Sequence, residues 1–431
     1  MKKKLLSLFM LVMCVTFVFA GGQSETDAEA SEQAEKGPVT IRWAYWGSGE
    51  RVTISQEAID LYESRNPGIK VNPEVSGGAG DHFVKVDTQL AGGSGPDIIQ
   101  MGGNIPDYAD VLLPLNKFAG NILNTEVIDP SAVASGTLDG QLKGVSTGVT
   151  MPALVYNKTM IEEAGAPLPE ISMTYEEFRE YLMMLKSKLP EGVYPMQDIG
   201  VMSNNSTPFG YWTRYNGTPL YDAETSSTDV TPKAAQKYLE LFMDYRENGL
   251  IPPPDIASGY AESNADTSSL IDGKVAIAFL YTNQLGGYQA ATTDEIALIE
   301  FPGAAKTKAL WQAPSQFYTV NKDSKNPEET VKFINFLVND PDAARILGNN
   351  RGASASASAR AAGASSPADQ RVLDYMEVSG PHTSPETDHV PHDTEFNSTL
   401  FLIYQRVAFG QNSPAEGGQE IHDLLVRLIN K

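Results

Sequence analysis

Alternation of apolar side chains marks the first ordered element of the chain. Within residues 39–46, Ile41, Trp43 and Tyr45 alternate with residues of the opposite face, which is the period-two pattern of a half-buried strand. Trp43 shares the core side with Ile41 in this pattern. The strand is predicted to end at the Gly-Ser-Gly turn of residues 47–49.

The following segments alternate between helical and strand patterns. Ile54, Ala58 and Leu61 recur at helical spacing and predict a helix that stops before the Asn-Pro-Gly sequence of residues 66–68. The resulting βαβαβ order predicts an α/β fold with a mainly parallel sheet wrapped by helices. The remaining elements of this unit are strands at residues 69–75 and 97–101 and a helix at residues 83–90.

The carboxyl edge of such a sheet is where ligands bind. The third predicted strand stops abruptly at Gly102, Gly103 and Asn104. A polar residue that closes a buried strand needs a hydrogen-bonding partner, because burying it unpaired costs free energy. We therefore expect Gln100 and Asn104 to face a cleft.

Later segments carry the start and stop signals of helices. Thr174 and Glu177 form a predicted capping box, and Thr231 predicts the start of a helix that ends at residues 248–249. Pattern and composition also predict a strand at residues 273–279, a helix that begins at residues 326–329, and an Ala/Ser-rich loop at residues 353–364.

The first residues predict export. Lysines at residues 2–4 precede an apolar run at residues 5–20, the layout of a cleaved signal peptide over residues 1–20. A membrane anchor is the alternative, but the run falls short of the roughly 20 residues that span a bilayer. Lipidation of Cys14 is disfavoured because residues 11–13, directly before it, include no small side chain. We therefore expect a periplasmic protein.

Composition narrows the classes of function. Without the three signal-peptide lysines the chain has 29 basic and 54 acidic residues, a net charge of −25, which argues against nucleic-acid binding. Its one cysteine lies in the signal peptide, which excludes disulfides and thiol catalysis in the mature protein. The acidic segment 21–37 lacks large apolar residues and is predicted to be a flexible leader. A mature length of about 410 residues exceeds one hydrophobic core and suggests two domains.

Several short motifs, in this order along the chain, resemble those of extracellular solute-binding proteins of family 1. These are the substrate-binding proteins of carbohydrate ABC transporters, similar to maltose- and multiple-sugar-binding proteins. Residues 96–101 match the family's "PDV-x-Q-M", and residues 112–115 match "LLPL". Ser146 stands where the family's "G-V-P" hinge strand usually has proline. The other matches are residues 156–158 to "YNK", 174–178 to "T-W-D-E-F", 273–277 to "G-K-x-A-M" and 327–333 to "P-E-E-A-x-x-F".

The resemblance covers nearly the whole mature chain and implies a two-lobed periplasmic-binding-protein fold of type II, with a hinge between α/β lobes. It implies an N-terminal lobe of residues 38–150 and 303–350, and a C-terminal lobe of residues 151–302 and 351–431. It also implies the function of an ABC importer's binding component. Such a protein captures a mono- or oligosaccharide between its lobes and delivers it to transmembrane permease subunits, as a monomer without a cofactor.

Candidate site residues follow from the chemistry of sugars. Sugars present apolar C–H faces and rings of hydroxyls, so their sites need aromatic platforms beside hydrogen-bonding side chains. Each aromatic candidate has an alternative as a core side chain, and Asp81 has an alternative as a helix cap. The candidate ligand-binding residues are Trp46, Ser48, Asp81, Gln100, Asn104, Trp212, Tyr215, Tyr281, Trp311 and Gln312.

Two other classes of function have weaker support. A secreted polysaccharide hydrolase needs two carboxylates across a cleft, but Glu176 and Glu177 have the character of helix-start charges. The sequence contains no G-x-S-x-G, H-E-x-x-H or P-loop motif. A metal-uptake binding protein is the other alternative, but prolines interrupt the densest cluster of potential metal ligands, so a solvated loop is the better interpretation and no metal site is expected. That cluster is His382, Glu386, Asp388, His389, His392 and Asp393.

Overall fold

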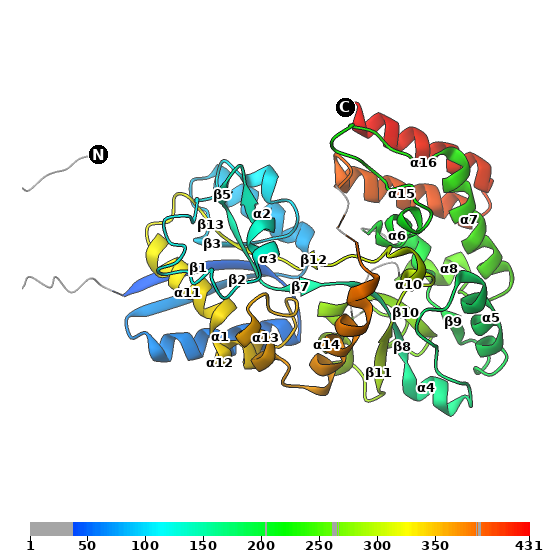
Figure 1. The fold of residues 1–431 in the computed structure, drawn as a ribbon, viewed down its shortest axis with the longest axis horizontal. Helices are drawn as coiled ribbons and strands as arrows, with labels where there is room; N and C mark the ends of the chain where they lie inside the picture. The colour runs from blue at the N-terminus through cyan, green and yellow to red at the C-terminus, as the bar shows by residue number, and fades with distance from the viewer. Residues whose placement is uncertain (1–37, 203–204, 261–264, 266, 385, 387–388) are drawn as a thin grey trace, which may run out of the picture. The chain divides into compact units, whose positions relative to one another are not determined.

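The computed structural model describes residues 38–431 except 203–204, 261–264, 266, 385 and 387–388. Residues 38–431 form one compact unit. The predicted signal peptide and acidic leader lie outside the described residues. The described unit is an α/β structure with two main sheets, each in its own lobe (Figure 1).

The N-terminal lobe is built on a five-stranded sheet in the order β2-β1-β3-β13-β6. β1 (Val39–Trp46) pairs in parallel with β2 (Ile69–Ser76) and with β3 (Ile98–Met101), which confirms the predicted parallel unit. β13 (Phe317–Val320) returns from far along the chain and pairs antiparallel with β3 and with β6 (Gly144–Ser146).

Helices pack on both faces of this sheet because β1 is apolar on both. Trp43 shares a buried cluster with Ile59 of α1 (Glu50–Arg65) and Phe333 of α11 (Pro327–Asn339). Ala44 shares a second cluster with Val86 of α2 (Ala79–Ala91). The smaller elements of this lobe are η1 (Ile105–Tyr108), α3 (Pro130–Ser135), β4 (Thr137–Leu138), β5 (Gln141–Leu142), α12 (Pro341–Leu347) and α13 (Ala357–Gly363).

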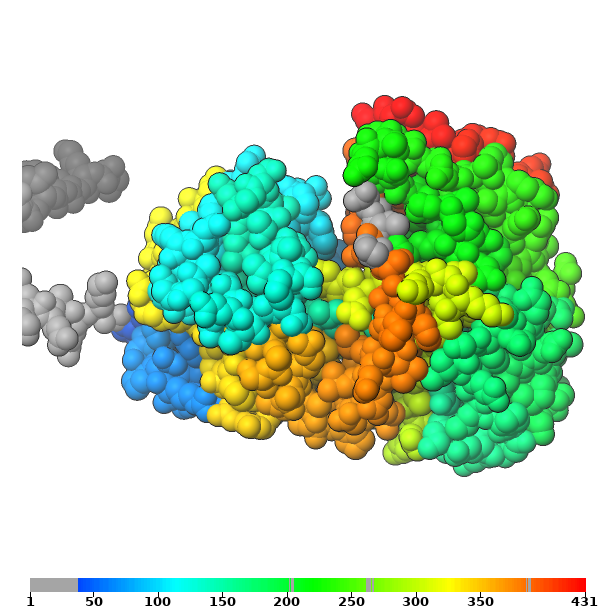
Figure 2. Space-filling view, viewed as in Figure 1, coloured from blue at the N-terminus to red at the C-terminus, as the bar shows by residue number. Residues whose placement is uncertain are grey.

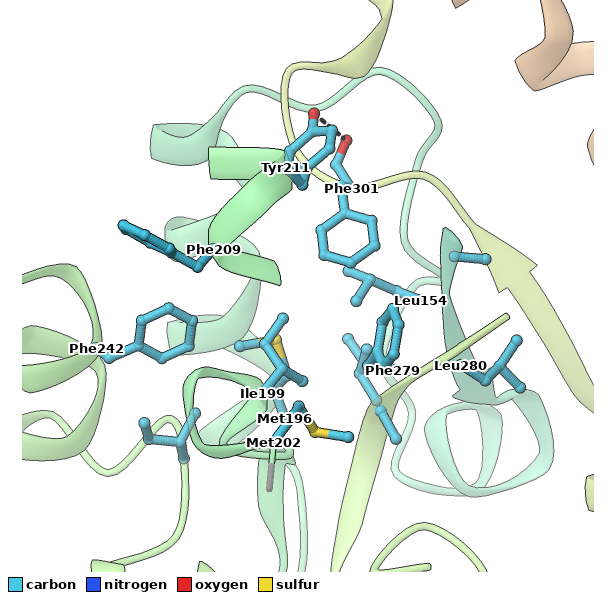
Figure 3. Packing of buried hydrophobic residues seen from close by; sticks show 14 of the residues in the cluster. Leu154, Met196, Ile199, Met202, Phe209, Tyr211, Phe242, Phe279, Leu280 and Phe301 are labelled. Atoms are coloured by element: carbon cyan, nitrogen blue, oxygen red, sulfur yellow. Dashed lines mark hydrogen bonds between the residues drawn. The ribbon is translucent and has the colours of Figure 1, made fainter. Parts of the chain in front are cut away.

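The C-terminal lobe is built on a four-stranded sheet in the order β11-β8-β10-β9. β8 (Pro152–Asn157) pairs antiparallel with β10 (Val275–Tyr281) and β11 (Ile296–Ile299), and β10 pairs in parallel with β9 (Tyr194–Met196). Its core includes Leu154, Phe279 and Phe301, with the Tyr211 hydroxyl donating to the Phe301 carbonyl over 3.4 Å (Figure 3).

Helices of the C-terminal lobe begin at the predicted signals. Thr174 and Glu177 form the predicted capping box of α5 (Tyr175–Lys186), and Thr231 caps α7 (Pro232–Glu247). The other helices are α4 (Lys158–Glu163), η2 (Ile199–Val201), α6 (Thr207–Tyr215), α8 (Pro254–Ala257), η3 (Ser258–Tyr260), η4 (Thr282–Gln284), α9 (Leu285–Ala290), α10 (Ala304–Thr307), α14 (Pro367–Ser379), η5 (Gly380–His382), α15 (Asp393–Ala408) and α16 (Pro414–Ile429).

Three extended segments lie side by side between the two sheets. β7 (Val149–Thr150) pairs antiparallel with β12 (Ala313–Pro314), and Val149 also forms a bridge with Ala353 (Figure 1). The packing is tight, since a Cβ atom at Gly148 would lie 2.6 Å from the carbonyl oxygen of Ala353. We refer to β7, β12 and residues 351–353 as the crossing segments.

The prediction of a loop at residues 353–364 is wrong for most of its length, because α13 (Ala357–Gly363) is helical. Alanine is the strongest helix former, and the buried side chain of Ala359 packs this short helix into the fold. The Ala/Ser-rich composition suggested a loop, although its alanines favour a helix.

Core packing also bears on where the lobes divide. Ala304 and Trp311 are buried in the core of the C-terminal lobe, and Ala355 is buried in the core of the N-terminal lobe. We therefore propose that the lobes divide within residues 312–316 and after residue 363, a shift from the boundaries that the sequence suggested.

Candidate functional site

The carboxyl ends of β1 and β3 form the first part of the candidate site. The two strands pair with Trp43 opposite Ile98 and Ala44 opposite Ile99, so their ends reach the same edge of the sheet. Trp46 is the last residue of β1, and Gly102 to Asn104 follow β3. This is the edge at which α/β sheets of this kind bind ligands.

Trp46 is half-buried against residues of α2. Its ring lies 5.1 Å from the ring of His82 and 5.8 Å from that of Phe83, measured between centroids. The remaining part of the indole stays accessible. An aromatic ring supported on one side and accessible on the other has the form of a stacking platform.

The polar candidates of this lobe have different environments. Asn104 is half-buried, and its Oδ1 accepts from the backbone N–H of Gly102 over 3.2 Å. Ser48 is exposed, with its carbonyl oxygen accepting from the backbone N–H of Arg51 over 3.2 Å. Asp81 is also exposed in the first turn of α2, whose cap residue is Gly78, so the alternative of Asp81 as that cap is wrong.

Gln100 does not reach the open edge of the sheet. Its side chain is fully buried, and its Oε1 accepts from Nε of Arg351 over 3.2 Å. The expectation that this side chain faces a cleft is corrected on that point, because it is buried and a buried guanidinium supplies the partner for its Oε1 atom. Its main-chain oxygen, by contrast, lies 2.9 Å from Nε2 of His82.

The C-terminal lobe supplies a second group of candidates around Tyr281, the last residue of β10. Its hydroxyl hydrogen-bonds the hydroxyl of Thr207 at the start of α6. Desolvation raises the pKa of Tyr281 to about 12, and the nearby carboxylates Glu386 and Asp393 act in the same direction. The phenol is therefore neutral and able both to donate and to accept.

Glu386 is a neighbour of both Tyr281 and Trp311. Trp311 is only 7% exposed, and the guanidinium of Arg214 stacks 5.1 Å from its ring centroid. Desolvation raises the pKa of Glu386, although His389 and Arg214 favour its charged form. Gln312 follows on the surface, exposed at the start of a crossing segment.

The two groups approach each other at Gly103 and His389. A Cβ atom on Gly103, in the loop after β3, would lie 3.5 Å from Nε2 of His389. The segment that carries Glu386 thus meets the segment that follows Gln100. In Figure 2 the surface is hollowed beside the crossing segments, between N-terminal-lobe residues in cyan and C-terminal-lobe residues in green.

Trp212 and Tyr215 belong to a different cluster. Both rings contact Tyr175 of α5, at 5.2 Å and 4.9 Å between centroids, and Trp212 also lies 6.1 Å from Tyr238 of α7. A shallow hollow next to Trp212 is lined mainly by residues of α7 and its start. The structure therefore groups these two candidates with the helices of the C-terminal lobe and not with Tyr281.

Four residues near the site were missed by sequence reasoning. His82, Thr207 and Arg214 lie within helices and carry no local motif that separates them from ordinary helix residues. Glu386 did carry a signal, because it lies in the histidine-rich cluster that was interpreted as a solvated loop. Its contact with Trp311 depends on tertiary packing that the sequence pattern does not order.

The described residues show neither a metal cluster nor a membrane-spanning helix. In the part of the chain that the structure describes, no group of three or more His, Cys, Asp or Glu side chains could hold a metal ion. His382 instead pairs with the buried carboxylate of Glu300. No described helix combines the length and apolar character needed to cross a bilayer.

The fold is that of a two-lobed α/β protein. The chain belongs to the bacterial extracellular solute-binding protein family, whose sequence model it matches over residues 35–344. The family resemblance seen in the sequence is thereby confirmed. The members of this family are extracellular proteins that bind a solute.

Similar proteins agree with this membership. A binding protein of Brucella abortus is 24% identical over 320 residues, which cover 71% of this chain and 73% of that protein. An oligogalacturonide-binding protein of Yersinia enterocolitica, solved with saturated digalacturonic acid, is 21% identical with a TM-score of 0.78, covering 91% of this chain and 99% of that one. An ABC substrate-binding protein of Listeria monocytogenes, solved with cycloalternan, is 19% identical with a TM-score of 0.76 and the same coverage.

Proposed function

We propose that this protein is the substrate-binding component of an ABC importer for a mono- or oligosaccharide. The observation that carries the proposal is the approach of Gly103, in the loop after β3, to His389. In the proposal, Trp46 belongs to an N-terminal wall of the site, and Trp311 and Tyr281 belong to a C-terminal wall. Each wall ends a strand of a different sheet, as ligand-gripping walls do in two-lobed binders.

The chemistry of the walls suits a carbohydrate. Trp46 offers an accessible aromatic face on which the C–H face of a sugar ring can stack. Asn104 and Tyr281 offer neutral groups that both donate and accept, which matches the hydroxyls of a sugar. Support for an oligosaccharide also comes from the Yersinia and Listeria proteins of like fold, whose structures contain saturated digalacturonic acid and cycloalternan.

The proposed mechanism is capture by lobe closure. A ligand that contacts both walls stabilises the closed arrangement in proportion to its differential affinity for it. Transmembrane permease subunits would then receive the closed form, with this chain acting as a periplasmic monomer after removal of residues 1–20. The protein would carry out no chemical step of its own.

The two alternatives have less support in the structure. Glu176 and Glu177 lie in the first turn of α5, where Glu177 accepts from the backbone N–H of Thr174 over 2.8 Å and so serves the capping box of the helix. Of the histidine-rich cluster weighed as a metal site, His382 is engaged with Glu300 and His392 lies at the start of α15. Part of that cluster falls outside the described residues.

A thermal-shift screen tests the proposal. Ligand that binds only the folded protein raises its melting temperature by mass action. We expect at least one of a panel of neutral and acidic mono- and oligosaccharides to raise it, and zinc to have no effect. A shift with zinc alone would favour metal uptake, and release of reducing sugar from mixed glycans would favour the hydrolase. Protein purified with a bound ligand needs unfolding and refolding before the screen.

A further inference from the structure

His82 connects the two strand ends of the N-terminal wall. Its side chain is 1% exposed, and its Nε2 lies 2.9 Å from the main-chain oxygen of Gln100. A carbonyl oxygen only accepts hydrogen bonds, so Nε2 carries the hydrogen. In the neutral ring Nδ1 is then left as an acceptor.

The ring of His82 also supports Trp46. The His82 and Trp46 rings lie 5.1 Å apart and are tilted by 58°, while Phe83 meets His82 edge-on at 5.0 Å. Phe83 contacts Trp46 as well, at 5.8 Å. The Trp46 indole thus packs against the rings of His82 and Phe83. Of these two, His82 is held by a hydrogen bond to the sheet.

The strand ladder does not provide this connection. The pairing of β1 with β3 covers Trp43 with Ile98 and Ala44 with Ile99, and it stops short of Trp46. Beyond that point the end of β1 and the end of β3 are joined through His82. A rotation of the His82 ring would therefore change the orientation of the Trp46 ring.

We propose that His82 is a positioning residue of the ligand site, whose ring, held by the Gln100 carbonyl, sets the orientation of the Trp46 platform. This inference rests on the proposed function in so far as Trp46 contacts the ligand. A histidine that merely fills the core would affect stability alone. A positioning residue also changes the environment of Trp46 and the affinity for ligand.

Protonation provides a way to separate these roles. Desolvation lowers the pKa of His82, Lys85 acts in the same direction, and the Gln100 carbonyl and Asp87 oppose them. Lys85 is itself paired with Glu74 of β2, and Asp87 accepts from the Tyr108 hydroxyl of η1 over 2.7 Å. Further charged or titratable residues on the surrounding elements are Asp81 of α2, Asp107 of η1 and Arg42 of β1, which also pairs with Glu74. His389 lies beside Gly103 of the loop after β3. Protonated His82 would place a second N–H at Nδ1 and require an acceptor for it.

The experiment uses the full chain with Trp212→Phe and Trp311→Phe, which leaves Trp46 and the buried Trp43 as emitters. Without any ligand, lowering the pH from 8 to 5 is expected to change the emission and its quenching by acrylamide, with a midpoint below 6.5. His82→Gln, which keeps a donor near the Nε2 position, is expected to remove this titration. His422→Gln is the matched control, because His422 bonds the Val230 carbonyl through Nδ1 and contacts none of these rings.

Affinity supplies the second measurement. With the saccharide that gives the largest melting shift in the screen, in a background that retains all four tryptophans, His82→Phe is expected to weaken binding about tenfold or more. His82→Gln is expected to recover most of the affinity. An unchanged emission titration in His82→Gln, or equal affinities of wild type and His82→Phe, would overturn the proposal. Because the emission titration needs no ligand, it decides the role of His82 toward Trp46 even if every saccharide fails to bind.

Discussion

The guanidinium of Arg351 and the side chain of Gln100 form a buried pair, with Nε of Arg351 donating to Oε1 of Gln100 over 3.2 Å. Arg351 belongs to the third crossing segment and is 3% exposed. Its Nη2 donates to Oγ of Ser55, and its guanidinium stacks 5.3 Å from the ring centroid of Trp43. The pair therefore fastens a crossing segment to the sheet of the N-terminal lobe.

Removing this anchor should destabilise the fold. Each hydrogen bond to a charged group contributes roughly 1.5–3 kcal/mol, so we expect Arg351→Met to lower the free energy of unfolding by at least that amount. Urea denaturation measures the change. Arg345→Met is the control, because Arg345 is 56% exposed in its side chain and pairs only locally with Asp342 of the same helix. Equal midpoints for the two variants would contradict the anchoring role.

The crossing segments should not tolerate a side chain at Gly148. An added Cβ atom would lie 2.6 Å from the Ala353 carbonyl oxygen and 2.7 Å from the Gly352 carbonyl carbon, which are backbone atoms that cannot rotate away. Overpacking of this kind costs roughly 1–3 kcal/mol, so Gly148→Ala should lower the melting temperature. Gly77→Ala, at a position with no neighbour within 4 Å, is the control and should leave it nearly unchanged.

Trp43 and Trp46 should respond in opposite ways to truncation. Trp43 is fully buried among Tyr45, Tyr318 and Phe333, so Trp43→Ala should cost roughly 3–5 kcal/mol of stability. Trp46→Ala should cost little stability and weaken saccharide binding by about 1–2 kcal/mol, as truncation of an aromatic contact does. Thermal melting and calorimetric titration separate the two effects. Normal affinity in folded Trp46→Ala would remove Trp46 from the proposed site.

A buried ion pair in the C-terminal lobe provides a further test of its core. Nη2 of Arg246 donates to Oδ2 of Asp198 over 2.5 Å, and the Tyr404 hydroxyl donates to Oδ1 over 2.8 Å. Asp198→Asn leaves the guanidinium without its counter-charge, which costs roughly 3–5 kcal/mol at buried sites. We expect urea denaturation to show this loss, whereas Asp244→Asn, whose pair with Arg179 is partly exposed, should lose far less.

Protonation of His82 at acid pH should also lower the stability of the folded protein. Because the pKa of His82 is lowered from its ordinary value of 6.5 by desolvation, the unfolded chain binds more protons than the folded one at mildly acid pH. The stabilisation by neutral His82 is complete above pH 6.5. It is lost as the pH falls from the pKa of His82 in the unfolded chain towards its lower pKa in the folded protein. The melting temperature of wild type should therefore drop more steeply from pH 7 to 5 than that of His82→Gln. Parallel pH profiles would contradict this assignment.

Local patterns predicted most elements of the fold. The alternation around Trp43 predicted β1 and its core-facing ring, and the capping signals at Thr174 and Thr231 predicted where α5 and α7 begin. Each of these elements can be predicted from the spacing of apolar and capping residues within its own segment of the chain. The helix α13 was missed, because an Ala/Ser-rich composition was interpreted as a loop and its packing on neighbouring elements is not visible in the segment itself.

The candidate site was predictable only in part. Strand-end position suggested Trp46 and Tyr281, and both lie at the ends of their strands. Gln100 shows where this reasoning fails, because its partner Arg351 is distant in sequence and reaches it only through the crossing segment. His82 carries no motif at all, and its importance follows from a carbonyl and two rings brought together by packing.

The most direct test is a calorimetric titration of the purified protein with the saccharides of the screen. The proposed capture between two walls predicts saturable binding of one molecule per chain. It also predicts that Trp46→Ala on one wall and Tyr281→Phe on the other each weaken this binding while the protein stays folded. Absence of heat with every saccharide in ligand-free protein, or binding that neither substitution affects, would contradict the assignment of this cleft as a carbohydrate site.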